Sequence, residues 1–459
     1  MAVLLDLSPE LVTAILDHLV PFLQTLDNLY LAGNHNLFTL ARPYTWREVD
    51  ITLSDNRQTS AALAERLLAF CADSAKVSAV RSLNITFTGF FDYHTPAIKT
   101  LGENLWRFTN LTHVTINCVN NTANFWTQPR YIQSIIEDLP ALLSLTIDGC
   151  IDTYCKADES LASLAALRIP PLKHLAARFC EVDDGVSQIW CYCSNLEVVE
   201  LAGGLAERFF KENSSLPLNG IRAKMDGTSE YSAGMYHILN PPRNAPGRPA
   251  IFHHAKTIKV ISDDANASTV DSDCWGLTNF FEDHPDEPSE TLTEIFLELS
   301  IDVYSFSVFL TGIRSAILER VGVVALGGVW IPSKFDEFLV ELTHTGGLFF
   351  DGFESLEELV LPCDGISPET LRLLPRLLAH APTLQHLYFA VADCEDGDLA
   401  VAAQTYAEAI STLASVSWRN RCCFNVSLPA GISPVRLRER PYQAPRWQGW
   451  NGIGEWWEI

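Results

Sequence analysis

Apolar residues recur along most of this chain with one spacing, in which an apolar residue is followed by others three and five positions later. Successive groups begin 24 to 38 residues apart, with one larger gap of 59. The last two members of each group lie on one face of an extended chain, which predicts a strand buried on that face. The ten groups are Val80/Leu83/Ile85, Leu111/Val114/Ile116, Leu142/Leu145/Ile147, Leu172/Leu175/Ala177, Leu196/Val199/Leu201, Ala255/Ile258/Val260, Leu292/Ile295/Leu297, Leu318/Val321/Val323, Leu356/Leu359/Leu361 and Leu384/Leu387/Phe389.

Between these groups the apolar spacing changes to that of helices. Ser367-Pro368-Glu369 places a capping side chain, a proline suited to the first helical turn and an acidic residue ahead of a Leu-rich stretch. Strand and helix therefore alternate, and strands joined by right-handed helical crossovers lie parallel. The pattern resembles long, irregular leucine-rich repeats. It implies an α/β solenoid over residues 53–430, with parallel strands on the concave face and helices on the convex face.

Two stretches interrupt the repeat. Residues 205–250 are rich in turn formers, and we expect an irregular insertion there. Residues 262–290 contain nine Asp or Glu and no Lys or Arg, which is typical of a solvated loop and leaves open contact with a basic partner. Residues 431–459 form a Trp-rich tail that either covers the end of the array or offers a recognition patch.

The first residues predict short amphipathic helices. Ser8 can cap a helix that begins at Pro9 and Glu10, and an apolar stripe follows until Pro21. The stripe consists of Leu11, Val12, Ile15, Leu16 and Leu19. Such short helices need a partner for their apolar face, because alone they cannot form a stable core.

This N-terminal segment, residues 1–52, resembles an F-box. The matching residues at its start are Leu7, Glu10, Leu11, Ile15, Leu16 and Leu19, and those at its end are Trp46, Arg47, Val49 and Ile51. The resemblance implies docking on a Skp-family adaptor, and through it on a cullin. The implied contact residues are Leu7, Pro9, Glu10, Leu11, Ile15, Leu16, Leu19 and Trp46. The alternative is a helical cap that packs on the repeats of its own chain.

Together, the two parts resemble F-box/leucine-rich-repeat substrate receptors. That resemblance implies a non-catalytic subunit of an SCF-type ubiquitin ligase, which holds a target protein for proteasomal degradation. The alternative is a repeat scaffold for protein interactions with no ligase connection.

Composition narrows the function classes. The formal net charge of −24 repels phosphate backbones, which argues against nucleic acid as a partner. No apolar run approaches the roughly 20 residues of a membrane span, and the N-terminus has no signal-peptide pattern. We therefore expect no membrane association and a cytoplasmic or nuclear protein, in which the 12 Cys residues are reduced thiols.

Candidate chemistry is sparse. No nucleophile elbow, P-loop, zinc-protease motif or dinucleotide-binding glycine motif occurs, and Cys191/Cys193 and Cys422/Cys423 lack partners at zinc-finger spacing. We expect no catalytic residue, metal or cofactor. Recognition would instead use strand residues that point away from the core. The expected target-binding residues are Glu200 and Lys259, with Phe296 and Tyr388 as anchors, unless they are ordinary surface residues.

Overall fold

The structure is a computed structural model. It describes residues 15–16, 44–53, 56–88, 95–118, 139–148, 172–178, 195–202, 218–225, 255–262, 290–299, 301–325, 330–344, 349–362, 365–390, 396–419, 421–427 and 436–441. The chain forms two compact units, unit 1 (Met1–Leu205) and unit 2 (Ala206–Ile459), and each is described by itself.

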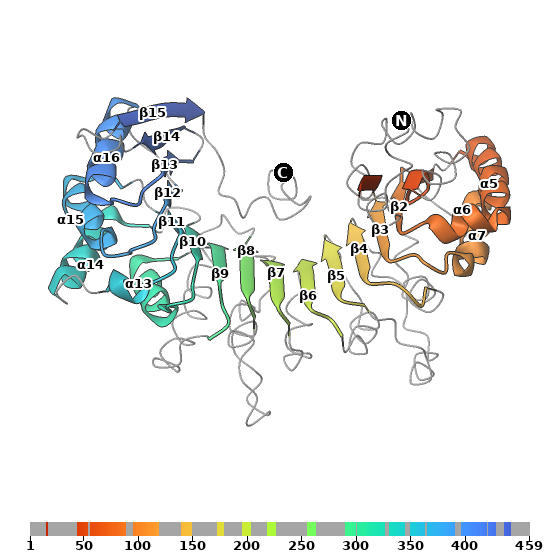
Figure 1. The fold of residues 1–459 in the computed structure, drawn as a ribbon, viewed down its shortest axis with the longest axis horizontal. Coiled ribbons are helices and arrows are strands. Elements are labelled where there is room, and N and C mark those ends of the chain that lie inside the picture. The colour runs from red at the N-terminus through yellow and green to blue at the C-terminus, as the bar shows by residue number, and fades with distance from the viewer. Residues whose placement is uncertain are drawn as a thin grey trace, which may run out of the picture. The chain divides into compact units, whose positions relative to one another are not determined.

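Unit 1 contains parallel strands that pair in chain order (Figure 1). These strands are β1 (Glu48–Leu53), β2 (Ser82–Phe87), β3 (His113–Cys118), β4 (Ser144–Asp148), β5 (His174–Arg178) and β6 (Val198–Ala202). Its helices are α5 (Arg57–Ala72), α6 (Ser74–Ala79), α7 (Pro96–Asn104) and the 3-10 turn η1 (Leu105–Arg107).

Unit 2 continues the same alternation of strand and helix. Its strands are β7 (Gly220–Met225), β8 (Thr257–Ser262), β9 (Glu294–Leu299), β10 (Arg320–Ala325), β11 (Glu358–Leu361), β12 (His386–Phe389), β13 (Ser415–Trp418), β14 (Cys422–Ser427) and β15 (Arg436–Pro441). Its helices are α13 (Val303–Gly312), α14 (Pro332–His344), α15 (Pro368–Leu378) and α16 (Asp396–Ala409), with the 3-10 turn η5 (Phe350–Gly352). Both units are thus α/β.

The last strands correct the expectation of a wholly parallel sheet. Strands β7 to β13 pair in parallel, whereas β14 pairs antiparallel with β13 and β15 antiparallel with β14. The connections explain the change, because three residues join β13 to β14 and eight join β14 to β15, whereas parallel neighbours require a crossover of a dozen or more. β15 also lies inside 431–459, the range assigned to the Trp-rich tail.

The repeats share one backbone hydrogen-bond pattern. The carbonyl oxygen of Arg47 accepts from the amides of Arg81 and Ser82, and that of Arg81 accepts from Thr112 and His113. In unit 2 the carbonyl oxygen of Glu357 likewise accepts from two successive amides of the next repeat, as do those of Asn219, Lys256, Thr293, Glu319 and Gln385. Each strand therefore begins at the same point relative to its neighbour, which keeps the apolar groups in register.

All ten predicted apolar groups lie on or directly before a strand. Three further strands have the same spacing, in the groups Trp46/Val49/Ile51 (β1), Leu218/Ile221/Ala223 (β7) and Leu413/Val416/Trp418 (β13). β1 lies partly within residues 1–52, which were expected to form a helical module. Because residues 48–53 pair with β2, the sheet begins before the expected end of that module. β7 likewise forms within 205–250, the expected irregular insertion.

The two faces of the unit 2 sheet differ. Phe389 in β12 packs against Tyr406 of α16, with ring centroids 5.3 Å apart, so its side of the strand faces the helices. Helices α13 to α16 lie on that side of β9 to β13 (Figure 1). Because side chains alternate along a strand, Tyr388 points to the opposite side. We call this opposite side the outer face.

Candidate protein-binding surface

The expected target-binding residues of unit 2 lie side by side on the outer face. The register pairs Lys259 with Phe296, Phe296 with Gly322, Gly322 with Val360, and Val360 with Tyr388. Phe296, Val324, Val360 and Tyr388 form one apolar cluster, against which Ala390 packs. The ammonium group of Lys259 lies 5.1 Å from the centre of the Phe296 ring. The sequence thus identified residues that the fold brings together.

The accessibility of this cluster differs from that expected of protruding anchors. Phe296 and Tyr388 are only 8% and 6% exposed, and Val360 is also buried. A partner that contacted these side chains would touch a largely buried apolar surface, not projecting aromatic rings.

Charged residues flank the cluster along the strands. Arg320 on β10 forms an ion pair with Glu294 on β9, and its Nε lies 3.7 Å from a carboxylate oxygen of Glu358 on β11. Beyond the other end of the cluster, Arg419 Nη1 lies 3.3 Å from Glu298 Oε1. An apolar centre between paired charges is suited to recognition of a protein surface, because the charges restrict which partners fit.

Glu200, the remaining expected target-binding residue, lies in unit 1 and belongs to a different cluster. Its carboxylate is buried and lies 3.2 Å from Nε2 of His174, whose Nδ1 lies 2.9 Å from the hydroxyl oxygen of Ser144. These residues come from the adjacent strands β4, β5 and β6. Glu200 is therefore placed to orient an imidazole, and its burial leaves little of it for contact with a target.

This Ser–His–Glu arrangement has the order of groups found in acyl-transfer enzymes, but the backbone amide of its serine is not free to contribute to an oxyanion hole. The amide of Ser144 donates to the carbonyl oxygen of Thr112 at 3.0 Å, so it is already used within the sheet. That amide is thus not available to stabilise an oxyanion. The contacts favour a hydrogen-bonded ladder that holds three strands together.

His113 extends the polar side of unit 1. It pairs in register with Ser144, and its Nδ1 lies 2.8 Å from the hydroxyl oxygen of Thr112. Burial lowers the pKa of His113 below its usual value, with further lowering by electrostatic interaction with His174 and Arg47, while Glu48 opposes this change. The folded unit therefore favours the neutral form of this histidine.

Among the expected adaptor-binding residues, the structure describes Ile15, Leu16 and Trp46. Ile15 and Leu16 are helical, and they are 37% and 3% exposed, respectively. Trp46 packs edge-on against Phe70 of α5, with ring centroids 5.5 Å apart, and under the ammonium group of Lys76 at 5.0 Å. Trp46 thus contributes to the packing of unit 1. Leu7, Pro9, Glu10, Leu11 and Leu19 lie outside the described residues.

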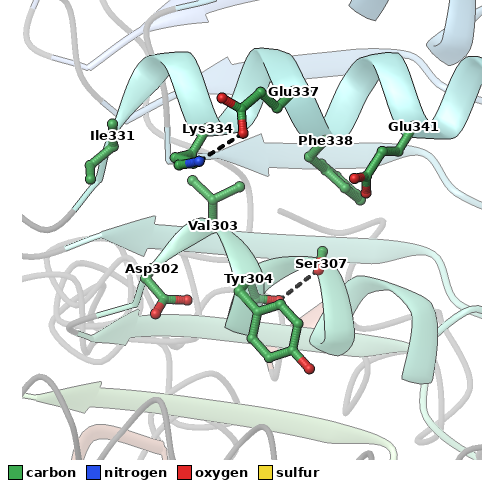
Figure 2. A pocket seen from close by; sticks show the side chains of 9 residues that line it. All are labelled: Asp302, Val303, Tyr304, Ser307, Ile331, Lys334, Glu337, Phe338 and Glu341. Carbon is green, nitrogen blue, oxygen red and sulfur yellow. Dashed lines mark hydrogen bonds and ion pairs between the residues drawn. The ribbon is translucent and has the colours of Figure 1, made fainter.

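A hollow between α13 and α14 was missed by sequence reasoning. It is lined by side chains from the start of α13, from successive turns of α14 and from the residues just before the two helices (Figure 2). Its exposed apolar residues, Tyr304 and Ile331, are 61% and 52% accessible. The sequence of α13 does contain a signal for this hollow. Its segment VYSFSVFL has apolar residues on a wider face than the helix needs to pack against the sheet alone.

Other chemistry is limited in the described part of the chain. No group of three or more His, Cys, Asp or Glu side chains there is placed to hold a metal ion. Cys71, Cys422 and Cys423 are buried free thiols, and burial raises the pKa of the Cys71 thiol against the opposing effect of Arg107. None of the described helices has both the length and the apolar character needed to cross a bilayer.

Comparisons with known proteins do not place the chain in a family. No protein-family model matches it, and no curated protein matches it significantly.

Proposed function

We propose that this protein is the substrate-recognition subunit of an SCF-type cullin-RING ubiquitin ligase. Its N-terminal helices would dock on a Skp-family adaptor, and its repeat units would hold the target protein. The chain itself performs no chemistry in this proposal. It raises the effective concentration of a target lysine near a ubiquitin-conjugating enzyme, which accelerates transfer without a catalytic residue of its own.

The observation that carries the recognition half is the register of the outer face. Lys259, Phe296, Gly322, Val360 and Tyr388 come from five successive strands and form one row. Repeat proteins use such rows for binding, because stacked strands create a wide surface whose side chains vary independently of the core. Ion pairs beside the row add the charge pattern that selects a partner.

The observation that supports the ligase half is the N-terminal sequence. Ile15, one of the residues that resemble an F-box, has a substantially accessible apolar side chain. A single exposed isoleucine is ordinary in itself, but here it belongs to a stripe with Leu11 and Leu19 at helical spacing.

The test compares two charge substitutions in the full chain. Ile15→Asp should abolish capture of purified Skp-family adaptor, because the carboxylate would have to be buried in an apolar interface. Leu68→Asp, at an exposed position on α5, should leave capture unchanged. Circular dichroism should show that both variants remain folded. Normal capture by folded Ile15→Asp would refute docking through the N-terminal helices, and no capture by the native chain would refute the ligase connection.

The second candidate is a repeat scaffold whose N-terminal helices cap the array. The burial of Leu16 favours this alternative, because that side chain is already covered. A scaffold would bind protein partners without any adaptor, so the adaptor experiment separates the two functions.

A further inference from the structure

Helices α13 and α14 enclose a hollow of about 330 Å³, at the small end of the usual range for ligand sites (Figure 2). Buried Val303 and Phe338 form its apolar floor. Tyr304 and Ile331 stand at its edge with more than half of their surfaces exposed. Large apolar residues beside an open hollow are a feature of binding sites, and Tyr in particular is enriched where proteins bind each other.

The floor of the hollow is rigid. Phe338 packs against Phe306 and Phe335, with ring centroids 6.3 Å and 6.2 Å away. Phe306 in turn packs edge-on against Trp330 at 5.5 Å. This aromatic cluster holds Phe338 in place before any ligand arrives, and a preformed site loses less conformational entropy on binding.

The lining is acidic. Three carboxylates (Asp302, Glu337 and Glu341) and one ammonium group (Lys334) line the hollow, which gives a net charge of −2. Lys334 donates to Glu337 at 2.8 Å, and this bond raises the pKa of Lys334 and keeps it charged. Asp302 accepts from the amide of Ser305 at 2.7 Å, which fixes its carboxylate at the start of α13. The chain's net charge of −24 adds to the attraction for cations.

We propose that this hollow binds a segment of a partner protein in which an aliphatic or aromatic side chain is flanked by Lys or Arg. The apolar side chain enters between Tyr304 and Ile331 and rests on Phe338, while the basic flanks meet Glu337 and Glu341. The volume accommodates one or two side chains, so the segment is short. The inference goes beyond the proposed function, because it requires neither the N-terminal helices nor a ligase.

The test uses a random peptide library displayed on phage and panned against the full native chain. Individual enriched peptides are then measured by fluorescence anisotropy against native and variant chains. The expected peptides carry an apolar residue next to Lys or Arg. Ile331→Ser should weaken their binding at least about tenfold, since it removes an exposed apolar contact without disturbing the core. Combined Glu337→Lys and Glu341→Lys should weaken it by at least a similar factor and reverse the sign of its salt dependence, because the lining then carries a net positive charge that repels the basic flanks.

Matched controls lie at exposed positions in unit 1. Leu68→Ser and Glu103→Lys make the same kinds of change far along the sequence, and they should leave peptide affinity unchanged. The proposal is overturned if enriched peptides lack the apolar and basic pair, if none are enriched, or if their affinities do not respond to the substitutions at Ile331, Glu337 and Glu341. Adaptor capture by these variants should stay normal, so failure here is distinguishable from failure of the ligase assignment.

Discussion

At the residue scale, Gly365 occupies a position that other residues fit poorly. Its φ of +69° lies in the left-handed region, and its carbonyl oxygen accepts from the buried Tyr406 hydroxyl at 3.1 Å. A Cβ there would overlap the ring of Phe389. That ring is also stacked on Trp418 at 5.2 Å, so it has little room to move. Backbone conformation and packing therefore both require glycine.

Gly365→Ala should destabilise unit 2 by roughly 2–5 kcal/mol, combining left-handed strain with overpacking. Hydrogen exchange of β12 and α16, measured in the full chain, checks this. The matched control is Gly102→Ala in α7, where a Cβ would meet nothing within 4 Å. That change should stabilise α7 by about 0.5–1 kcal/mol, because alanine favours a helix. Equal effects of the two changes would contradict the packing argument.

The lowered pKa of His113 predicts a pH dependence in unit 1. Above its unfolded pKa of about 6.5, His113 is neutral in both states. As the pH falls below that value, the unfolded chain binds a proton that the folded chain resists, so the free energy of unfolding decreases until the folded pKa is reached. Exchange in β3, corrected for intrinsic rates, should therefore accelerate between about pH 7 and pH 5.

A variant at His113 tests this pH dependence. His113→Gln should reduce the pH dependence of hydrogen exchange in β3, because a glutamine side chain does not titrate. Arg47, Glu48 and His174 act on His113 and remain in this variant. His380→Gln, at an exposed position 3.2 Å from Asp351 in unit 2, should leave the response of β3 unchanged. An unaltered slope in His113→Gln would assign the pH dependence to another group.

At the element scale, Ser367 links two helices. Its hydroxyl oxygen caps α15 by accepting from the Thr370 amide at 3.0 Å, and its hydroxyl donates to the Asp336 carboxylate of α14 at 2.8 Å. Thr370 also donates to Asp336. A local capping signal in the sequence therefore serves a tertiary contact as well.

Ser367→Ala should cost about 1–2 kcal/mol, because the cap and the bond to α14 are lost together. Hydrogen exchange should accelerate in both α14 and α15. Thr95→Ala, at the start of α7, is the matched control, since the Thr95 side chain makes no capping hydrogen bond. The control should have an effect of only a few tenths of a kcal/mol. Acceleration confined to α15 would show that the Asp336 contact contributes little.

The apolar spacing predicted most of the strands, because one buried face imposes the same two-residue alternation on each. β7 and β13 have this spacing too, in Leu218/Ile221/Ala223 and Leu413/Val416/Trp418. β7 was missed because turn-forming residues surround it, whereas the β13 group has the same spacing as the predicted groups and could have been found from it. The antiparallel direction of β14 followed from its short connection, which the spacing alone does not encode.

The candidate site was less predictable than the fold. Alternation correctly assigned Phe296 and Tyr388 to one face, but it contains no information about how much neighbouring side chains bury them. The hollow beside α13 combines Tyr304 with Ile331 and Phe338, which belong to separate parts of the sequence. Such a site depends on how two helices pack, and a one-dimensional pattern does not specify that packing.

At the scale of the whole molecule, the N-terminal segment is either a docking module for an adaptor or a cap on the repeats. β1 and Trp46 belong to unit 1, since β1 pairs with β2 and Trp46 packs against Phe70. A deletion that tests the segment must therefore end before them, at residue 43. If the segment is a docking module, the truncated chain should lose adaptor capture and keep native hydrogen exchange in β1 and α5.

A cap gives the opposite result, because removing it would expose apolar surface of the first repeat at about 25 cal/mol per Å². Exchange in β1 and α5 would then accelerate, and the unfolding transition would shift to lower denaturant concentration. Full-length Ile15→Asp serves as the control, since it changes one exposed side chain and retains the segment. If the truncation destabilises β1 and neither the native chain nor Ile15→Asp captures adaptor, the helices are a cap and the ligase connection fails.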